Sequence, residues 1–563
     1  MSNQEELNGQ ARKTSLNRRS FVRSVAAAGA ALGVTSKASP ATPESDAASS
    51  AKLSGVGALS GQQRQKRAFQ IRHNAALYHS QQPLPNADTN GDEGLPNYIG
   101  TFSKTLPHND LGEVDSRAYT TYLKAIQTGK PADFEAIPMG GIGKLANPQS
   151  SYAFALEGPD SHQIGLAPPP SFSSAGMAAE LVEDYWLALT RDVAFADYGT
   201  SPLIQQAATD MSRLTAYSGP STNRGLTPDV IFRGGNPDDL NGPFISQFLA
   251  LPVPYGMTTV EQRYKTAAPG IDFMTSLVEW VALQRGRAAS QQLSFDPTLR
   301  YIRNGRDLGS YVHSDFSYQA LLNTALILLG FGAPAVSNAN PYRSYKTQSS
   351  FTTFGAPNVL DMIGRVSAAA LKAAWYHKWL LHRRIRPEAF AGRVHNTVTK
   401  AAQYPIHSDL TSSAALQGVF SRFGTYLLPQ AYPEGSPTHP SFPAGHAALV
   451  GAGVTVLKAF FQVSATIPNP MVASSDGLSL IPYTGAPLTI AGELNKLASN
   501  ISLGRDTAGV HYRSDGFAGM QLGEAVALGI LQDLVSCYTE DFDGFTITRF
   551  DGRVATICAN CIA

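Results

Sequence analysis

The chain of 563 residues carries 44 basic and 43 acidic side chains, a formal net charge of +1, and only 15% of its residues are charged. This balance gives no sign of a nucleic-acid or anionic-membrane partner, because both usually require a clear excess of positive charge. The length allows two or three average domains, although helical enzymes of this size can share one continuous core.

The first 38 residues are typical of a targeting segment rather than of a folded domain. Arg18 and Arg19 form a twin-arginine pair, residues 25–34 are apolar, and Ala38 ends a small-residue cleavage site. The apolar run is far shorter than the roughly 20 residues that a membrane-spanning helix needs. These features predict a bacterial protein exported by the twin-arginine pathway, periplasmic or extracellular; a basic disordered tail is the alternative.

Residues 39–97 are predicted to connect this segment to the main domain. Residues 41–58 are rich in Ala, Ser and Pro, which is typical of a mobile linker. Residues 62–78 favour a surface helix, and residues 83–97 favour a loop because Pro, Gly, Asn and Asp recur there. The predicted division is therefore a signal at 1–38, a linker and surface segment at 39–97, a main domain at 98–536 and a tail at 537–563.

The main domain is predicted to be mainly α. Apolar residues recur at helical spacing within 175–195, at Leu181, Tyr185, Leu189 and Val193. Residues 319–329 are apolar nearly all round, which predicts a buried helix. Further helices are expected at 203–214, 271–286 and 359–381. Strand patterns are few, and only residues 545–550 and 553–557 are predicted to pair as a hairpin, around Asp551. The many glycines and prolines favour long ordered loops or a large subunit interface.

The first segment with chemical content lies at the end of the helix expected at 359–381. Lys378 and Arg386 are eight residues apart, about 80° around a helix, so both side chains can lean toward one site. Pro387 biases Arg386 away from the α region and is expected to end the helix there.

The second segment runs from His439 to His446 and leads into an apolar helix expected at 447–461. Pro443 and Gly445 fit a loop-to-helix junction, where free backbone N–H groups and the positive end of the helix dipole attract an anion. A histidine at such a junction can donate or accept a proton near neutral pH. By itself the segment is also typical of the start of a buried helix.

The third segment contains Arg505, His511 and Asp515 and precedes a second small-residue helix expected at 516–534. Together the three segments offer three permanent cations, a backbone donor at Gly445 and two imidazoles. Guanidinium groups match tetrahedral oxyanions bidentately, whereas a lysine acts as a point charge. Three cations converging on one pocket would form a site for an anion of the size of phosphate or vanadate.

The motifs in these segments are Lys-x7-Arg-Pro, Pro-Ala-Gly-His and Arg-x5-His-x3-Asp. In combination they resemble the superfamily of vanadium-dependent haloperoxidases and type 2 acid phosphatases. The seven-residue spacer, His439 and the stretch at 167–198 are similar to the algal and cyanobacterial bromoperoxidase branch, and the likeness spans roughly 98–535. Two positions depart from the pattern. Ala444 stands where many members have a serine that bonds vanadate, and Gly504 stands where phosphatases have serine.

The resemblance implies a fold of two four-helix bundles and a vanadate cofactor, without haem. It implies that His511 binds vanadium as the only covalent protein ligand. The groups implied to neutralise the vanadate oxygens are Lys378, Arg386, Arg505 and the Gly445 N–H. A homo-oligomer, either a dimer or a larger assembly, is also implied.

The implied activity is a haloperoxidase that uses hydrogen peroxide to oxidise a halide to hypohalous acid or an equivalent species, which reaches small organic halogen acceptors. His446 is implied to take and return the proton, and Lys378 to polarise the O–O bond. His439 is expected either to tune His446 and the halide pocket, a role that favours bromide over chloride, or only to cap the loop.

Two other functions stay open. The first is an acid phosphatase, in which His511 attacks a phosphomonoester and His446 protonates the leaving group. The second is an exported oxyanion-binding or shell-forming protein that does not turn over either substrate. The seven-residue spacer, His439 and the stretch at 167–198 favour the haloperoxidase over the phosphatase.

Neighbouring side chains carry secondary expectations. Asp515 is expected to orient His511, and Asp315 to pair with a site arginine, because buried cations need a counter-charge. His377 is expected either to face the pocket mouth or to point away from it. We expect His382 to be structural. Arg383 and Arg384 are expected to lie in solvent or at an interface.

Neither calcium nor a zinc site is favoured. Residues 337–350, where some relatives have acidic ligands, contain no Asp or Glu, and calcium prefers several carboxylate oxygens. One Cys-x-x-Cys pair near the C-terminal end is too little for zinc. The three cysteines, Cys537, Cys558 and Cys561, are expected to form at most one disulfide after export and to have no catalytic role.

Overall fold

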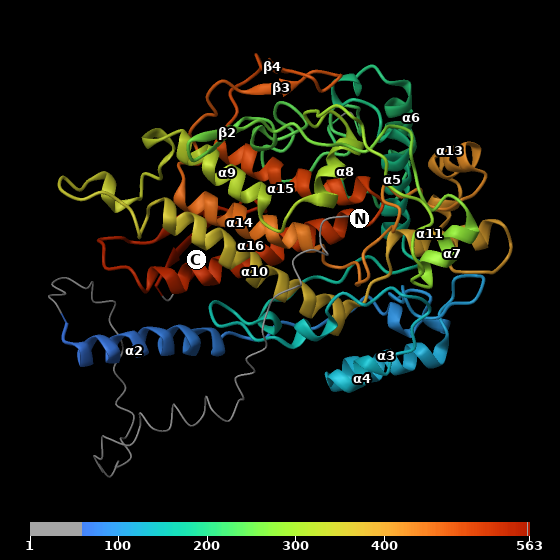
Figure 1. Ribbon diagram of the computed structural model, residues 1–563, viewed down its shortest axis with the longest axis horizontal. Coiled ribbons are helices and arrows are strands. Elements are labelled where there is room, and N and C mark those ends of the chain that lie inside the picture. Colours follow the sequence, from blue (N-terminus) through green and yellow to red (C-terminus); the bar gives the residue numbers. More distant parts are fainter. Residues whose placement is uncertain (1–58, 224, 560, 563) are drawn as a thin grey trace, which may run out of the picture. The chain divides into compact units, whose positions relative to one another are not determined.

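Helices dominate the structure, a computed structural model that describes residues 59–223, 225–559 and 561–562 (Figure 1). The described residues belong to one unit, Gly55–Ala563, and the strands found in them form small antiparallel sheets of two or three strands. The prediction of a mainly α fold is confirmed. The division into two four-helix bundles and the domain boundaries after 38, 97 and 536 stay predictions. The predicted signal at 1–38 and the linker at 41–58 lie outside the described residues.

A buried helix, α14 (Gly445–Phe460), lies at the centre of one helical bundle. Its partners are α10 (Ala356–Tyr376), α15 (Ile490–Thr507) and α16 (Arg513–Val535), and Figure 1 shows α10, α14 and α16 running side by side. Small residues permit this packing: a Cβ on Gly523 of α16 would lie 2.1 Å from the Ala448 carbonyl oxygen of α14. The helices predicted at 447–461 and 516–534 are confirmed.

Two further helices flank this bundle. α8 (Gly305–Ser314) packs against α15, and α9 (Gln319–Gly330) packs against α10 and α14. The helix predicted at 319–329 is therefore confirmed, and its apolar surface contributes to the same hydrophobic core as α14.

A second hydrophobic core surrounds α5 (Ala175–Thr190). Its neighbours are α6 (Pro202–Met211), α11 (Pro387–Val398), α12 (Ser408–Thr411) and α13 (Ala414–Phe423). The carboxylate of Asp210 joins three of these helices, because it accepts hydrogen bonds from Trp186 Nε1 at 2.9 Å and from the Ala415 amide at 3.1 Å.

The remaining α-helices and the strands complete the described fold. The helices are α2 (Gly61–Ser80), α3 (Ser116–Thr128), α4 (Pro131–Glu135) and α7 (Leu277–Gln284). The strands are β1 (Val253–Tyr255), β2 (Thr258–Val260), β3 (Met471–Ala473), β4 (Leu480–Pro482), β5 (Phe545–Thr548), β6 (Val554–Cys558) and β7 (Cys561–Ile562). The predicted hairpin is confirmed, since β5 and β6 pair antiparallel with Thr548 opposite Val554. β5 and β6 contribute to the same core as α14.

Two predicted helices are shorter in the structure. The helix predicted at 175–195 ends at Thr190, and Phe195 belongs to a 3-10 turn, η5 (Phe195–Asp197). The helix predicted at 271–286 begins only at Leu277, because the side chain of Ser276 caps it by accepting the Glu279 amide. The Ser276 cap thus sets an end that hydrophobic spacing alone does not fix.

The helix predicted at 359–381 differs most from the structure. α10 ends at Tyr376 and continues as a π-helix, η9 (His377–His382), after which Arg383 has a left-handed backbone with φ of 36°. Arg386 is extended, as predicted, but Pro387 begins α11 instead of ending the preceding helix. Lys378 and Arg386 therefore do not share one helix, and the predicted angle between them is wrong.

The described residues also bear on the cysteines and on membrane insertion. Cys558 is disulfide-bonded, and Cys537 is a free, exposed thiol, which agrees with the expectation of one disulfide and one odd cysteine. No helix in the described part of the chain is both long enough and apolar enough to cross a membrane.

Candidate active site

Three separate elements bring the three predicted cations together; we call Lys378, Arg386 and Arg505 the cation cluster. Lys378 lies on the π-helix η9, Arg386 is the residue that precedes α11, and Arg505 lies in the last turn of α15. All three side chains are buried. The Lys378 ammonium donates to the carbonyl oxygens of Pro440 at 2.8 Å and Ser441 at 2.7 Å, which ties the loop before α14 to the cluster.

The cation cluster has no carboxylate partner within the described part of the chain. Arg386 donates to the carbonyl oxygens of His439 at 2.9 Å and Val510 at 2.7 Å. Arg505 donates to the Val312 carbonyl oxygen at 2.8 Å, and its buried Nε has no hydrogen-bond partner. Buried cations without a counter-charge are unfavourable unless an anion neutralises them. The cluster is therefore built for an oxyanion.

Burial and mutual repulsion also act on the protonation of the cluster. Burial lowers the pKa of Lys378 well below its usual value, and the nearby charges of Arg386 and Arg505 lower it further. Burial is likewise the main cause that lowers the pKa of Arg386 to about 9. A bound anion would reverse both effects, because it stabilises the charged forms.

His511 presents a neutral imidazole to this cluster. Its Nδ1 lies 2.8 Å from Asp515 Oδ2, and its Nε2 lies 3.0 Å from Arg386 Nη1. Because the carboxylate can only accept, Nδ1 carries the proton and Nε2 presents its lone pair. Burial, followed by the Arg386 charge, lowers the pKa of His511 well below its usual value. A neutral imidazole oriented by a carboxylate is the form that binds a metal.

Asp515 is held as a carboxylate by several donors. Arg384 Nη1 donates to Oδ1 at 2.7 Å, and the Ser441 hydroxyl and the Tyr512 amide donate to Oδ2. Burial alone would raise the pKa of Asp515, but the Arg384 charge and the bonds from His511 and Ser441 hold it well below its usual range. The expected contact between Asp515 and His511 is present, and Asp515 makes it as a carboxylate.

Arg384 is the main departure from the predicted surroundings. Its guanidinium is fully buried, donates to Glu180 at 2.7 Å as well as to Asp515, and lies 4.0 Å from the centre of the Tyr512 ring. The expectation that Arg384 lies in solvent or at an interface is wrong. Arg383 keeps 14% of its side chain exposed and donates to the Leu380 carbonyl oxygen at 2.9 Å.

Replacing Arg384 by alanine should lower the free energy of unfolding by about 3–5 kcal/mol, because Glu180 and Asp515 would stay buried without their cation. Chemical denaturation followed by circular dichroism measures this loss. Arg365→Ala is the matched control: Arg365 pairs with Asp361 at 2.6 Å on the surface of α10, with 40% of its side chain exposed. Its loss should stay below about 1 kcal/mol. Equal losses for the two variants would contradict the buried role of Arg384.

The start of α14 supplies an imidazole and backbone N–H groups without helical acceptors. Gly445 is the first helical residue, and Ala444 before it provides no side-chain cap, so the amides of the first turn have no helical acceptor. His446 follows, with 28% of its side chain exposed and its Nε2 3.1 Å from Asp315 Oδ1. Burial, followed by the Arg505 charge, lowers the pKa of His446 below its usual value, although Asp315 opposes this shift. The prediction that Asp315 pairs with an arginine is wrong, since its ion-pair partner is His446.

The other predicted histidines differ in their contacts. His439 is half-buried, with Nδ1 2.9 Å from Arg386 Nη2 and its ring 4.7 Å from that of Trp375, so its contacts position Arg386. His377 is buried and places Nε2 3.0 Å from the Ile164 carbonyl oxygen. His382 is buried against Phe442, in agreement with a structural role. The proposed tuning of His446 by His439 stays a prediction.

Two contacts of the site are not indicated by the sequence patterns. Ser441 bonds Asp515, and the ring of Tyr432 lies 5.4 Å from the Arg505 guanidinium. The sequence does contain a signal for the position of Arg384. In an extended segment alternate residues share a face, so an extended stretch before Pro387 would put Arg384 and Arg386 on one side. The bridge between Thr101 and Arg384 is consistent with this extended backbone.

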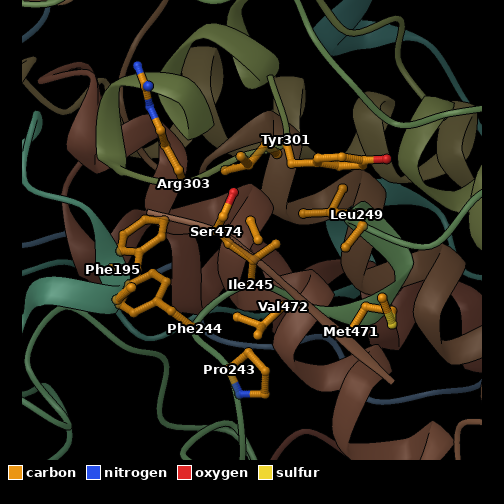
Figure 2. A pocket seen from close by; sticks show the side chains of 14 residues that line it. Phe195, Pro243, Phe244, Ile245, Leu249, Tyr301, Arg303, Met471, Val472 and Ser474 are labelled. Carbon is orange, nitrogen blue, oxygen red and sulfur yellow. The ribbon is translucent and has the colours of Figure 1, made fainter. Parts of the chain in front are cut away.

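A shallow hollow lies apart from these residues (Figure 2). Its walls are apolar, and the rings of Phe195 and Phe244 stack 3.9 Å apart on one side. Figure 2 shows the Arg303 side chain extending away from the two rings. No member of the cation cluster lines this hollow, so it does not offer the convergent charges that an oxyanion needs.

Comparisons with known proteins agree with this geometry. Residues 362–539 match the family described as the VCPO second helical-bundle domain. The chain is 35% identical to a vanadium-dependent bromoperoxidase of Ascophyllum nodosum over 487 residues, covering 82% of this chain and 87% of the relative. It is 32% identical to a vanadium-dependent bromoperoxidase of Corallina pilulifera, covering 89% of this chain and 100% of the relative. The homohexameric structure of a second vanadate-dependent bromoperoxidase from Ascophyllum nodosum superimposes with a TM-score of 0.86 at 30% identity, covering 92% of this chain and 94% of that one.

Proposed function

This chain belongs to the vanadium-dependent haloperoxidases, and we propose that it uses hydrogen peroxide to oxidise a halide, bromide in preference to chloride, to hypohalous acid or an equivalent halogenating species. The observation that carries the proposal is the buried cation cluster, which has no carboxylate partner in the described residues and lies against the neutral His511. Such a cluster needs a bound oxyanion, and a neutral imidazole can in addition bind its metal centre.

The residues present fit vanadate. The cation cluster and the Gly445 N–H would neutralise its oxygens, and the unpartnered Nε of Arg505 is a buried donor ready for such an oxygen. His511 Nε2 would bind vanadium, because its Nδ1 is occupied by Asp515. When bound, vanadate supplies a Lewis acid that activates peroxide for attack by the halide without haem or flavin. The contact that the usual serine makes is absent at Ala444.

The protein's own residues hold and move the protons. Because the Asp315 carboxylate faces His446 Nε2, that nitrogen carries the proton and Nδ1 is left as the base. His446 would take a proton from hydrogen peroxide at Nδ1 and later return it. Lys378 would place its positive charge beside the peroxide, and burial of the cluster keeps bulk water from screening that charge.

A paired assay tests the proposed reaction against its alternatives. Purified protein freed of vanadate is titrated with orthovanadate, in one cuvette with peroxide, bromide and a halogen-acceptor dye, and in another with a chromogenic phosphate ester. We expect bromination to appear only with vanadate while any ester hydrolysis falls. Fast ester hydrolysis that vanadate merely inhibits would identify an acid phosphatase with His511 as nucleophile. No turnover in either cuvette would identify a binding protein.

Vanadate binding should take up protons, and its affinity should rise as the pH falls. Lys378 has a pKa well below its usual value in the anion-free protein, and a bound oxyanion raises this pKa, so the lysine gains a proton on binding. Titration calorimetry in two buffers of different ionisation enthalpy measures the uptake. Lys378→Gln should lose it, whereas Lys372→Gln, another lysine of the same helical segment, should retain it. Identical uptake by wild type and Lys378→Gln would contradict the assignment.

Assembly and export complete the proposal. We propose a homo-oligomer, which the homohexameric relative supports, and mass photometry of the purified protein measures its subunit number.

We also propose export by the twin-arginine pathway to the periplasm or beyond, because the sequence contains the pair Arg18 and Arg19. Replacing both arginines by lysine should retain the protein in the cytoplasm.

A further inference from the structure

The last turn of α8 supports Arg505, the member of the cation cluster that lies on α15. The Val312 carbonyl oxygen of this turn accepts a hydrogen bond from Arg505 Nη1 at 2.8 Å. Nη1 also lies 3.5 Å from the hydroxyl oxygen of Tyr432, whose ring centre is 5.4 Å from the guanidinium carbon. The buried Nε has no hydrogen-bond partner among the described residues. Nη1 therefore anchors the guanidinium to the protein, while Nε is left for an oxyanion.

Tyr432 is itself held against α8 by two contacts. Its hydroxyl donates to the Gly309 carbonyl oxygen at 2.7 Å. Its ring stacks on the imidazole of His313, with the ring centres 3.8 Å apart and the two planes 9° from parallel. Tyr432 is only 2% exposed, so close packing leaves its ring little freedom to move while these contacts persist. One intervening ring thus connects His313 to Arg505.

The Glu434 carboxylate fixes the orientation of this imidazole. His313 Nε2 lies 2.6 Å from Glu434 Oε1. Burial alone would raise the pKa of Glu434, but the hydrogen bond from His313 holds it below its usual value. Because a carboxylate can only accept, Nε2 carries the proton of this bond. The side chains of His313 and Glu434 are 24% and 53% exposed, so the pair lies at the solvent edge of a contact series whose inner members, Tyr432 and Arg505, are buried.

We infer that His313 is a positioning residue for the cation cluster: it holds Tyr432 against Arg505 and so keeps the unpartnered Arg505 Nε available to the oxyanion. The inference rests on the proposed function, because it assigns a role to a residue that surrounds the same site. His313 acts through Tyr432 and not on the oxyanion itself. Its loss should therefore weaken oxyanion binding and leave the chemical step nearly intact.

The expected result of replacing His313 by alanine is a loss of vanadate affinity. Calorimetric titration of the anion-free variant with orthovanadate should give a Kd about two- to ten-fold above the wild-type value, the range expected for one aromatic contact. At saturating vanadate, kcat for bromide oxidation should change less than about two-fold, because the bound oxyanion then holds Arg505 in place. His73→Ala is the matched control, since it removes an imidazole that also stacks on a ring, that of Phe69 on α2, and it should keep both wild-type values.

Further substitutions separate the stacked ring from general damage to the fold. His313→Phe keeps a ring on Tyr432 and should return the Kd to within about two-fold of the wild-type value. His313→Gln keeps a donor for Glu434 but has no ring, and it should not restore the Kd. In the Tyr432→Leu variant, which lacks the intervening ring, the additional change His313→Ala should have little further effect, because both residues act through one contact.

Inorganic phosphate is a second oxyanion probe, so the affinity series does not depend on bromination. An unchanged Kd in His313→Ala, failure of His313→Phe to restore it, or additive losses in the double variant would overturn the inference. Wild-type protein that binds either oxyanion but oxidises no bromide with vanadate and peroxide would refute the proposed function alone, and the Kd series would still decide the role of His313. Wild-type protein that binds neither oxyanion would overturn both.

Discussion

Replacing His511 by alanine should abolish vanadate-dependent bromide oxidation. Loss of a residue that only orients a metal ligand typically costs 10- to 100-fold in affinity or activity, so loss of the ligand itself should cost more than about 100-fold. The reason is structural: His511 Nε2 faces the cation cluster, and Asp515 fixes the proton on Nδ1. The measurement is the rate of bromination across an orthovanadate titration, together with the vanadium content of the dialysed protein.

Two controls separate this effect from damage to the fold. Arg384, Ser441 and the Tyr512 amide still bond Asp515 in the variant, so His511→Ala should keep its fold and circular dichroism, although the cavity and the lost hydrogen bond should lower its unfolding midpoint. His407→Ala removes a histidine of a distant loop whose partner is Asp409, and it should retain full activity. Full activity of His511→Ala with normal vanadium content would contradict the ligand assignment.

Replacing His446 by alanine should lower kcat by about 10²- to 10⁴-fold, the usual contribution of a positioned acid–base group. Vanadate affinity should change much less, because His446 bonds Asp315 and donates to no member of the cation cluster in the described contacts. Steady-state kinetics at saturating vanadate and an independent vanadate titration distinguish the two quantities. A larger loss of vanadate affinity than of kcat would show that His446 binds the cofactor.

The pH profile and a matched variant add to this prediction. Burial and the Arg505 charge lower the pKa of His446 below its usual value in the anion-free protein, and a bound oxyanion opposes this shift because it stabilises the imidazolium. Acidification protonates the base, so the wild-type kcat should show an acid limb that is absent from His446→Ala. His162→Ala, which removes an exposed imidazole paired with Asp160, should keep both the limb and the rate.

The sequence predicts which residues form the site better than it predicts the secondary structure and burial of the segments on which they lie. The cation cluster, Gly445 and His511 lie in three segments with distinctive spacing, and oxyanion chemistry explains why those residue types occur together. The helices next to them follow from small-residue runs: Gly523 and Ala448 approach so closely that larger side chains would separate α14 from α16. These features are local in sequence and therefore visible in it.

The features that the sequence does not predict depend on non-local burial of polar groups. α15 carries an apolar stripe at Ile490, Leu494, Leu497 and Ile501, but its other faces are also buried and bear polar residues such as Asn495 and Asn500, which obscure the stripe in the sequence. The π-helix at Lys378 has no hydrophobic pattern that separates it from an α-helix. Arg384 resembles a surface residue in an arginine-rich run. The extended stretch before Pro387 indicates only that it shares a side with Arg386, and its burial depends on the distant partners Glu180 and Asp515.

The position of vanadium in crystals of the protein soaked with orthovanadate tests the central claim most directly. Anomalous difference density locates vanadium independently of any assumption about its ligands. We expect one strong peak bonded to His511 Nε2 and surrounded by Lys378, Arg386, Arg505 and the Gly445 amide. Loss of that peak in crystals of the His511→Ala variant with an unchanged fold would confirm His511 as the vanadium ligand. A vanadium peak away from His511, or a cation cluster left without vanadium at saturating orthovanadate, would contradict it.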